Sequence, residues 1–114
     1  MSGRRAERVG RQVVQALATV IEHGVHDPRL AGITFTSAKA TDDLRTVRVF
    51  FSVLGDNVAV EAAREGLKAA SGFLRREVAQ RLELRYAPAL MFEYDESIHT
   101  AERIDKLLRQ EREN

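Results

Sequence analysis

The stretch LKAASGFLRR, residues 67–76, interrupts the longest helical pattern of this chain and decides how its fold is read. A glycine inside a helix costs about 1 kcal/mol relative to alanine, and a serine favours helix ends because its hydroxyl competes for backbone partners. We therefore predict two helices that meet at Ser71-Gly72. A helix that begins at Ser71 presents unpaired backbone N–H groups and the positive end of its dipole, which attract anions.

Strand-like segments lie on both sides of this helical region. Residues 45–54 precede it and residues 90–94 follow it, and both segments alternate apolar with more polar side chains. The helices between them are long enough for a crossover connection, so the later strand can return parallel to the earlier one. The predicted inward positions are Val47, Val49, Phe51 and Val53 in the first segment and Leu90, Phe92 and Tyr94 in the second.

A hairpin and a first helix complete the predicted domain. The first strand of the hairpin runs from Ile33 to about Lys39 and turns at residues 41–43 into the strand at 45–54. The first helix ends near Gly24. All helices that the core needs then cover one face of the sheet, so we predict a two-layer α+β domain with the order αββααβ and a further C-terminal helix. The apolar positions of the first helix are Val9, Val13, Leu17 and Val20.

The composition is that of one small domain. With 114 residues and 44% hydrophobic residues the chain closes a single core, and we expect residues 109–114 to fray because they lack an apolar anchor. The absence of cysteine fits a reducing cytoplasm. No apolar run approaches the roughly 20 residues of a membrane span, and the N-terminus is too charged for a signal peptide. We therefore expect a cytoplasmic protein.

The net charge of +1 hides an uneven distribution of charge along the chain. Arg4, Arg8 and Arg11 share one outward sector of the first helix, and further cations surround the glycine break, whereas acidic residues prevail after Glu93. This asymmetry favours a single nucleic-acid-binding face built from both groups of cations. The alternative is a set of solvated helix faces without a ligand.

Four blocks of sequence carry a resemblance to a known family. They are RVGRQVVQALATVIEHGVHDPRL (residues 8–30), DDLRTVRVFFSVLG (42–55), AASG (69–72) and LRYAPALMFEYDESIHTAERIDKLL (84–108). Their order and spacing resemble the ribosome-binding factor A family, and the element order αββααβ resembles a type II KH domain, here spanning residues 1–108. The resemblance implies a cytoplasmic bacterial assembly factor that binds the small (30S) ribosomal subunit and its 16S rRNA. It also implies a role in late 30S maturation, in 16S rRNA processing and in cold adaptation. We expect a monomer, with other assembly factors as further candidate partners.

KH domains hold a single strand with a GxxG loop, and this chain contains no GxxG. In the resembled family an Ala-x-Gly kink replaces that loop, which places the kink at residues 70–72. We therefore expect contacts with structured rRNA through shape and phosphates, with little reading of base sequence. The alternative is that Gly72 only lets the helices turn onto the sheet. The candidate RNA-binding residues are Arg4, Arg8, Arg11, Arg45, Arg48, Ala70, Ser71, Gly72, Arg75 and Arg76.

An enzymatic interpretation rests on polar residues near the C-terminal end. These residues have the ligand chemistry of a divalent metal site, as a nuclease requires. Their spacing matches no recognisable ligand triad. We therefore predict no catalytic residue, no metal and no cofactor. The cluster consists of Glu93, Asp95, Glu96 and His99.

A protein-interaction module is the alternative to RNA binding. The C-terminal helix carries an apolar stripe that packs either on its own domain or on a partner protein, without direct RNA contact. The stripe consists of Ala101, Ile104, Leu107 and Leu108.

Three further residues also have two interpretations. Phe50 is either a stacking platform for a base or a cover for the sheet. Arg81 and Arg85 either bind RNA or pair with carboxylates.

Overall fold

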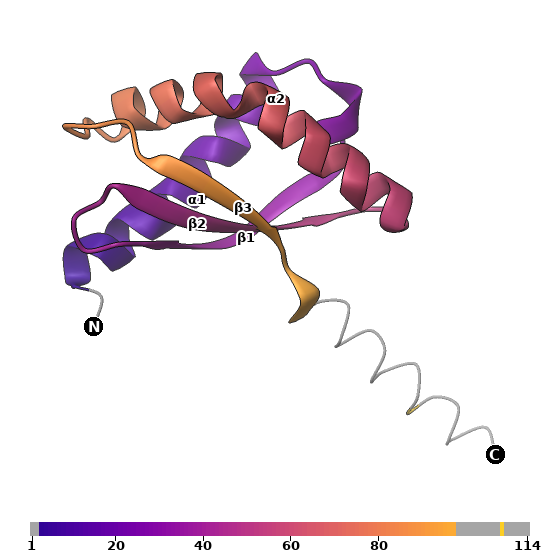
Figure 1. The fold of residues 1–114 in the computed structure, drawn as a ribbon, viewed down its shortest axis with the longest axis horizontal. Coiled ribbons are helices and arrows are strands. Elements are labelled where there is room, and N and C mark those ends of the chain that lie inside the picture. Colours follow the sequence, from indigo (N-terminus) through magenta and orange to yellow (C-terminus); the bar gives the residue numbers. More distant parts are fainter. Residues whose placement is uncertain (1–2, 98–107, 109–114) are drawn as a thin grey trace.

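The structure, a computed structural model, describes residues 3–97 and 108. Two long helices pack on one face of a three-stranded sheet, and the side chains between them form one core (Figure 1). The predicted C-terminal helix and frayed tail lie outside the described residues, apart from Leu108. In chain order the elements are α1 (Arg4–Gly24), the short 3₁₀ helix η1 (Pro28–Leu30), β1 (Ile33–Ala40), β2 (Thr46–Val53), α2 (Asn57–Arg81) and β3 (Ala89–Tyr94).

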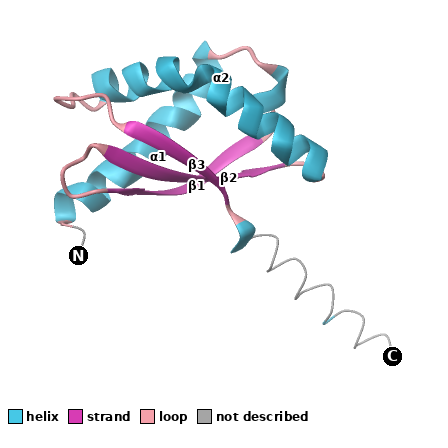
Figure 2. Ribbon diagram, viewed as in Figure 1, coloured by secondary structure: helices cyan, strands magenta, loops and turns pink. Residues whose placement is uncertain are grey.

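The sheet has the predicted order β1-β2-β3 (Figure 2). β1 and β2 form the antiparallel hairpin, and β3 returns parallel to β2, with Val47 opposite Leu90. The register of the hairpin shifts between Phe35 and Ser37, which marks a β-bulge at Thr36 that the sequence pattern did not indicate. The α+β fold class and the sheet topology are confirmed.

The core lies between the inward face of the sheet and the two helices. All four apolar positions predicted for the first helix are buried, and Val47, Val49 and Phe51 of β2 have no exposed surface. α1 ends at Gly24, as predicted. α2 contributes a second buried row on the same side of the sheet, which consists of Val60, Ala63, Leu67, Leu74 and Val78.

α2 is one continuous helix across Ser71-Gly72, so the prediction of two helices is wrong. Leu67 and Leu74 lie two helical turns apart on the same face of α2, and both are almost fully buried. Burial of one leucine contributes about 1.5–3 kcal/mol, which exceeds the cost of about 1 kcal/mol for a helical glycine. The helix still changes direction near its middle (Figure 1), as a Gly/Ser pair often causes. The break therefore bends the helix without ending it.

Both ends of α2 are capped. The Asp56 carboxylate accepts a hydrogen bond from the backbone N–H of Ala59 at 3.1 Å, as expected of an N-cap. At the other end Glu83 has a φ of 54°, and the backbone N–H of Leu84 donates to the carbonyl of Ala79 at 2.9 Å. This is a Schellman motif in which glutamate holds the position that glycine usually takes.

Candidate nucleic-acid interface

Ala70, Ser71 and Gly72, which we call the bend, lie in the second half of α2. Gly72 is exposed, and Ala70 and Ser71 are half-buried. Because the helix continues through these residues, their backbone N–H groups bond within it, and the predicted free helix N-terminus is wrong. The atom nearest to a Cβ built at Gly72 is Nη1 of Arg76, at 3.5 Å, which is an ordinary van der Waals distance. Packing within the described part of the protein therefore does not require a glycine at this position.

Two other glycines inside the helices have a clear packing role. A Cβ at Gly10 lies 2.6 Å from the carbonyl oxygen of Ala38, so this glycine lets α1 approach the backbone of β1. A Cβ at Gly66 lies 3.0 Å from Leu30, so this glycine lets α2 approach η1. Sequence reasoning missed both because their partners are distant along the chain. Of the three, Gly72 is the one at which a Cβ meets no backbone atom and no tightly packed side chain, only the end of Arg76 among the described residues.

A groove of about 260 Å³ runs between the middle of α2 and β3. Its floor is apolar, from Leu90 and Phe92, while Arg64, Lys68 and Ser71 stand along its helical side. Arg64 also pairs with a glutamate one turn away, at 3.3 Å. Cations and a hydroxyl above an apolar floor suit a sugar-phosphate backbone, because phosphate oxygens accept hydrogen bonds from these side chains. This groove, which we call the Lys68 groove, also contains Ser71 of the bend. Lys68 was not among the candidate residues that we predicted from the sequence.

Arg75 and Arg76 follow the bend but have different surroundings. Arg75 donates from Nε to the carbonyl of Pro88 at 3.0 Å and from Nη2 to the carbonyl of Ala87 at 3.2 Å. These bonds fasten the α2–β3 loop to the helix, which gives Arg75 a structural role. The guanidinium of Arg76 instead lies over Gly72 and is exposed. Of the pair, Arg76 is the cation better placed for a ligand at the bend.

The α1 arginines (Arg4, Arg8 and Arg11) are exposed along the first turns of α1. The other end of α1 lies beside the middle of α2, since a Cβ at Gly24 is 3.7 Å from the ring of Phe73. From Arg8, the middle one of the three, to Gly24 α1 rises by about 24 Å, at about 1.5 Å per residue. The structure therefore does not bring the α1 arginines and the bend into the single compact patch that the sequence suggested. They form two groups at different ends of the helical layer.

A further group, the Tyr86 cluster (Arg45, Arg85 and Tyr86), forms where the β1–β2 turn meets the α2–β3 loop. The guanidinium carbons of Arg45 and Arg85 lie 5.2 and 5.8 Å from the centroid of the Tyr86 ring. The backbone N–H of Gly3 donates to the carboxylate of Asp42 in the β1–β2 turn at 2.9 Å. The start of α1 and the Tyr86 cluster therefore lie at the same end of the molecule (Figure 1). Arg85, for which a carboxylate partner was considered, lies over an aromatic ring.

Two arginines that the sequence offered as possible RNA contacts, Arg48 and Arg81, form ion pairs with carboxylates. Arg48 lies on the sheet face away from the helices and bonds Glu93 at 2.8 Å, which raises the pKa of Arg48. Its guanidinium carbon also lies 5.4 Å from the ring of Phe50. Arg81 pairs with Glu77 at 3.4 Å, as one of its alternatives proposed. These cations are less available to phosphates than Arg76 or the α1 arginines.

Comparison with known proteins decides the family. The model of the family described as ribosome-binding factor A matches residues 5–108 of this chain. The chain belongs to the ribosome-binding factor A family. The ribosome-binding factor A of Geobacter sulfurreducens is 42% identical over 106 residues, which cover 93% of this chain and 90% of that protein.

Solved structures of ribosome-binding factor A share the fold. The crystal structure of the protein from Thermus thermophilus superimposes with a TM-score of 0.68 at 26% identity, covering 78% of this chain and 94% of that one. A second set of coordinates for the Thermus thermophilus protein, a homology model fitted into a cryo-EM map of its complex with the 30S subunit, gives a TM-score of 0.66 at 25% identity. It covers 80% of this chain and 96% of that one. The predicted family and fold class are thus confirmed.

Two acidic residues near the C-terminal end of this ribosome-binding factor A fold, Glu93 and Asp95, have partners within the protein. Asp95 accepts hydrogen bonds from the hydroxyl of Thr36 at 2.6 Å and from the backbone N–H of Ser97 at 3.0 Å. Bonds from Ser97 and then Thr36 lower the pKa of Asp95. Across residues 3–97 and 108, the structure shows no group of three acidic, histidine or cysteine side chains that suits a metal ion. His99 lies outside the described residues.

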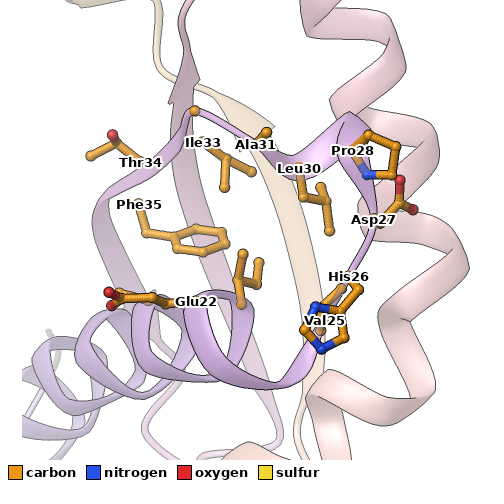
Figure 3. Close-up of a pocket in the computed structure, with 13 residues that line it drawn as sticks. Glu22, Val25, His26, Asp27, Pro28, Leu30, Ala31, Ile33, Thr34 and Phe35 are labelled. Atoms are coloured by element: carbon orange, nitrogen blue, oxygen red, sulfur yellow. The ribbon is translucent and has the colours of Figure 1, made fainter.

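A hollow of about 620 Å³ lies at the opposite end of α1 from the α1 arginines. It is formed by the last turns of α1, η1 and the start of β1, with Phe35 and Leu30 pointing toward it (Figure 3). His26 and Asp27 lie at its edge, and a hydrogen bond from Arg29 lowers the pKa of Asp27. No lysine or arginine is among the residues that line the hollow, so it does not have the composition of a phosphate site. No helix in the described part of the chain is both long and apolar enough to cross a bilayer.

Proposed function

We propose that this protein is a non-catalytic assembly factor that binds the small (30S) ribosomal subunit and contacts its 16S rRNA through phosphates. The observation that carries the proposal is Gly72, a glycine inside a helix that no contact among the described residues requires. It is exposed, next to Arg76 and to Ser71 of the Lys68 groove. A helix surface without a side chain lets a backbone approach closely, and the neighbouring cations favour an anionic one. A family relative fitted into a 30S complex supports the small subunit as the partner.

The spacing of the cations suggests how such a factor acts. The α1 arginines and the bend are separated by about 24 Å along α1, so each group contacts a different segment of rRNA. A rigid domain that contacts both segments binds best when they have one relative arrangement. Such a protein shifts rRNA between conformations by its differential affinity for them, and no bond is made or broken.

We further propose the stage and the conditions of action that the family resemblance implies, and this mechanism is compatible with them. A factor that favours one rRNA arrangement acts late, when the 16S rRNA is largely folded, and its binding makes the precursor competent for processing. Misfolded RNA helices rearrange more slowly in the cold, so the factor matters most for growth at low temperature. It acts in the cytoplasm and leaves the subunit once the favoured arrangement is reached.

Equilibrium binding to purified small subunits at several salt concentrations tests the proposal. Arg76→Gln and Arg8→Gln should each weaken binding and reduce the slope of log K against log salt by about 1, because each removes one phosphate contact. Lys39→Gln is the matched control and should bind like the wild type, because it changes an exposed cation that pairs with Arg48 in the strand register, on the sheet face away from the helices. A flat salt dependence of the wild-type chain would overturn the proposal and favour contact with ribosomal protein.

A further inference from the structure

Tyr86 is an exposed aromatic ring with two arginines beside it. Its exposed fraction is 54%, although the guanidinium carbons of Arg45 and Arg85 lie close to the ring centroid, at 5.2 and 5.8 Å. We propose that Tyr86 is a stacking site for one unpaired nucleobase of rRNA, with Arg45 and Arg85 contacting the phosphates beside that base. This inference rests on the proposed function, since it names a second mode of contact with the same RNA.

The loop that carries Tyr86 is held in place from three directions. Arg75 donates hydrogen bonds to the carbonyls of the two residues that follow Tyr86, to Ala87 at 3.2 Å and to Pro88 at 3.0 Å. Pro88 is fully buried, and the backbone N–H of Ala89 donates to the carbonyl of Arg45 at 2.8 Å. An aromatic ring on a fixed loop loses little conformational freedom when a base stacks on it. The contacts around Tyr86 therefore hold the platform in place before RNA binds.

The chemistry of the cluster favours RNA over an acidic protein. Guanidinium groups bind phosphates and carboxylates alike, so the two arginines do not separate these partners. The tyrosine does, because unpaired bases stack on exposed aromatic rings and every base offers a flat π-face. The neighbouring start of α1 adds Arg4 at the same end of the molecule, which favours a chain of phosphates over a single anion. Sequence reasoning did not group these residues, because they come from two loops that are distant along the chain.

Binding of the full chain to purified small subunits and to protein-free 16S rRNA tests the inference. Tyr86→Leu should weaken both interactions by about 5- to 150-fold, which is the usual contribution of one stacked base. The salt slope should stay unchanged because no charge is removed. Tyr86→Phe keeps the ring and should bind within about twofold of the wild type. Met91→Ala, at a side chain with a similar exposed fraction of 53%, is the matched control.

The outcomes separate the inference from the proposed function. If Tyr86→Leu binds like the wild type, the stacking site is wrong while the salt-dependent binding stands. If Tyr86→Leu weakens binding to subunits but not to bare rRNA, the ring contacts a ribosomal protein and the inference is wrong. If the wild type shows no salt-dependent binding, the proposed function fails and the inference fails with it.

Tyrosine NMR gives a direct readout, because the chain has two tyrosines and no tryptophan. In a Tyr94→Phe background the ring of Tyr86 is the only tyrosine signal. Hexaadenylate RNA should move its ring protons upfield, since a stacked base shields them, whereas inorganic polyphosphate should not. Equal shifts with both probes would show anion contact without stacking and would overturn the inference.

Discussion

Gly10, Gly66 and Gly72 all lie inside long helices, but replacing them has different consequences. The backbone carbonyl of Ala38 lies 2.6 Å from a Cβ at Gly10 and cannot rotate away as a flexible side chain would. At Gly72 a Cβ meets only the end of the Arg76 side chain, at 3.5 Å. The effect of a methyl group at each site therefore depends on the neighbouring atoms more than on helix propensity.

We predict opposite effects of alanine at Gly10 and Gly72. Gly10→Ala should lower the free energy of unfolding by up to about 2 kcal/mol, since overpacking costs about 1–3 kcal/mol and improved helix propensity returns about 1 kcal/mol. Gly72→Ala should raise it by about 0.5–1 kcal/mol and still weaken binding to small subunits. Urea unfolding and equilibrium binding measure the two effects. A less stable Gly72→Ala protein would mean that the fold itself needs this glycine.

Glu83 has a backbone conformation that residues other than glycine and asparagine adopt at a cost in free energy. Its φ of 54° lies in the left-handed region, where a non-glycine residue is destabilised by about 1–2 kcal/mol. Glu83 is exposed and ends α2 in a Schellman motif. Glu83→Gly should therefore stabilise the fold by about 0.5–1 kcal/mol, seen as a higher melting temperature. Glu83→Ala, which keeps the Cβ, is the control and should not be stabilised.

The hydrogen bond from Thr36 to Asp95 should make stability depend on pH. The folded protein lowers the pKa of Asp95, so the contribution of this group is present above the ordinary Asp pKa and is lost as the pH falls through the lowered value. Thr36→Val should cost about 1 kcal/mol at neutral pH, and the difference from wild type should shrink below about pH 3.9. Denaturant unfolding at several pH values measures it. A difference that stays constant down to about pH 2 would rule out a bond to the ionised carboxylate.

At the scale of elements, alternation and helical spacing were sufficient for most of the fold. The inward face of β2 and the apolar row of α1 were predicted correctly because each reflects burial of one face, which a local pattern records. The parallel return of β3 followed from the length of the crossover. These features need no knowledge of specific contacts.

α2 was misread because local propensity was weighed without tertiary packing. The spacing of Leu67 and Leu74 already continues one helical face across the break, and that signal was available in the sequence. The bulge at Thr36 and the left-handed Glu83 left no such signal, since both depend on partners outside the local segment. Most cations of the candidate site could be identified one by one from the sequence. Their grouping could not be predicted, because the Tyr86 cluster joins two loops and the α1 arginines lie far from the bend.

At the scale of the whole molecule, the domain presents two groups of cations on one rigid core. The α1 arginines lie at the end that also holds the Tyr86 cluster, and Arg76 lies at the bend beside the Lys68 groove. In the function that we propose, binding through both groups would allow this small domain to favour one arrangement of two rRNA segments over others. A domain that used only one group would bind RNA without constraining its conformation.

Hydroxyl-radical footprinting of 16S rRNA on immature small subunits tests this claim most directly. The wild-type chain should protect two separate segments of the rRNA backbone. Arg8→Glu should lose one segment and Arg76→Glu the other, while Lys39→Glu keeps both. A single protected segment that both variants lose together, or a footprint that neither variant changes, would contradict the account.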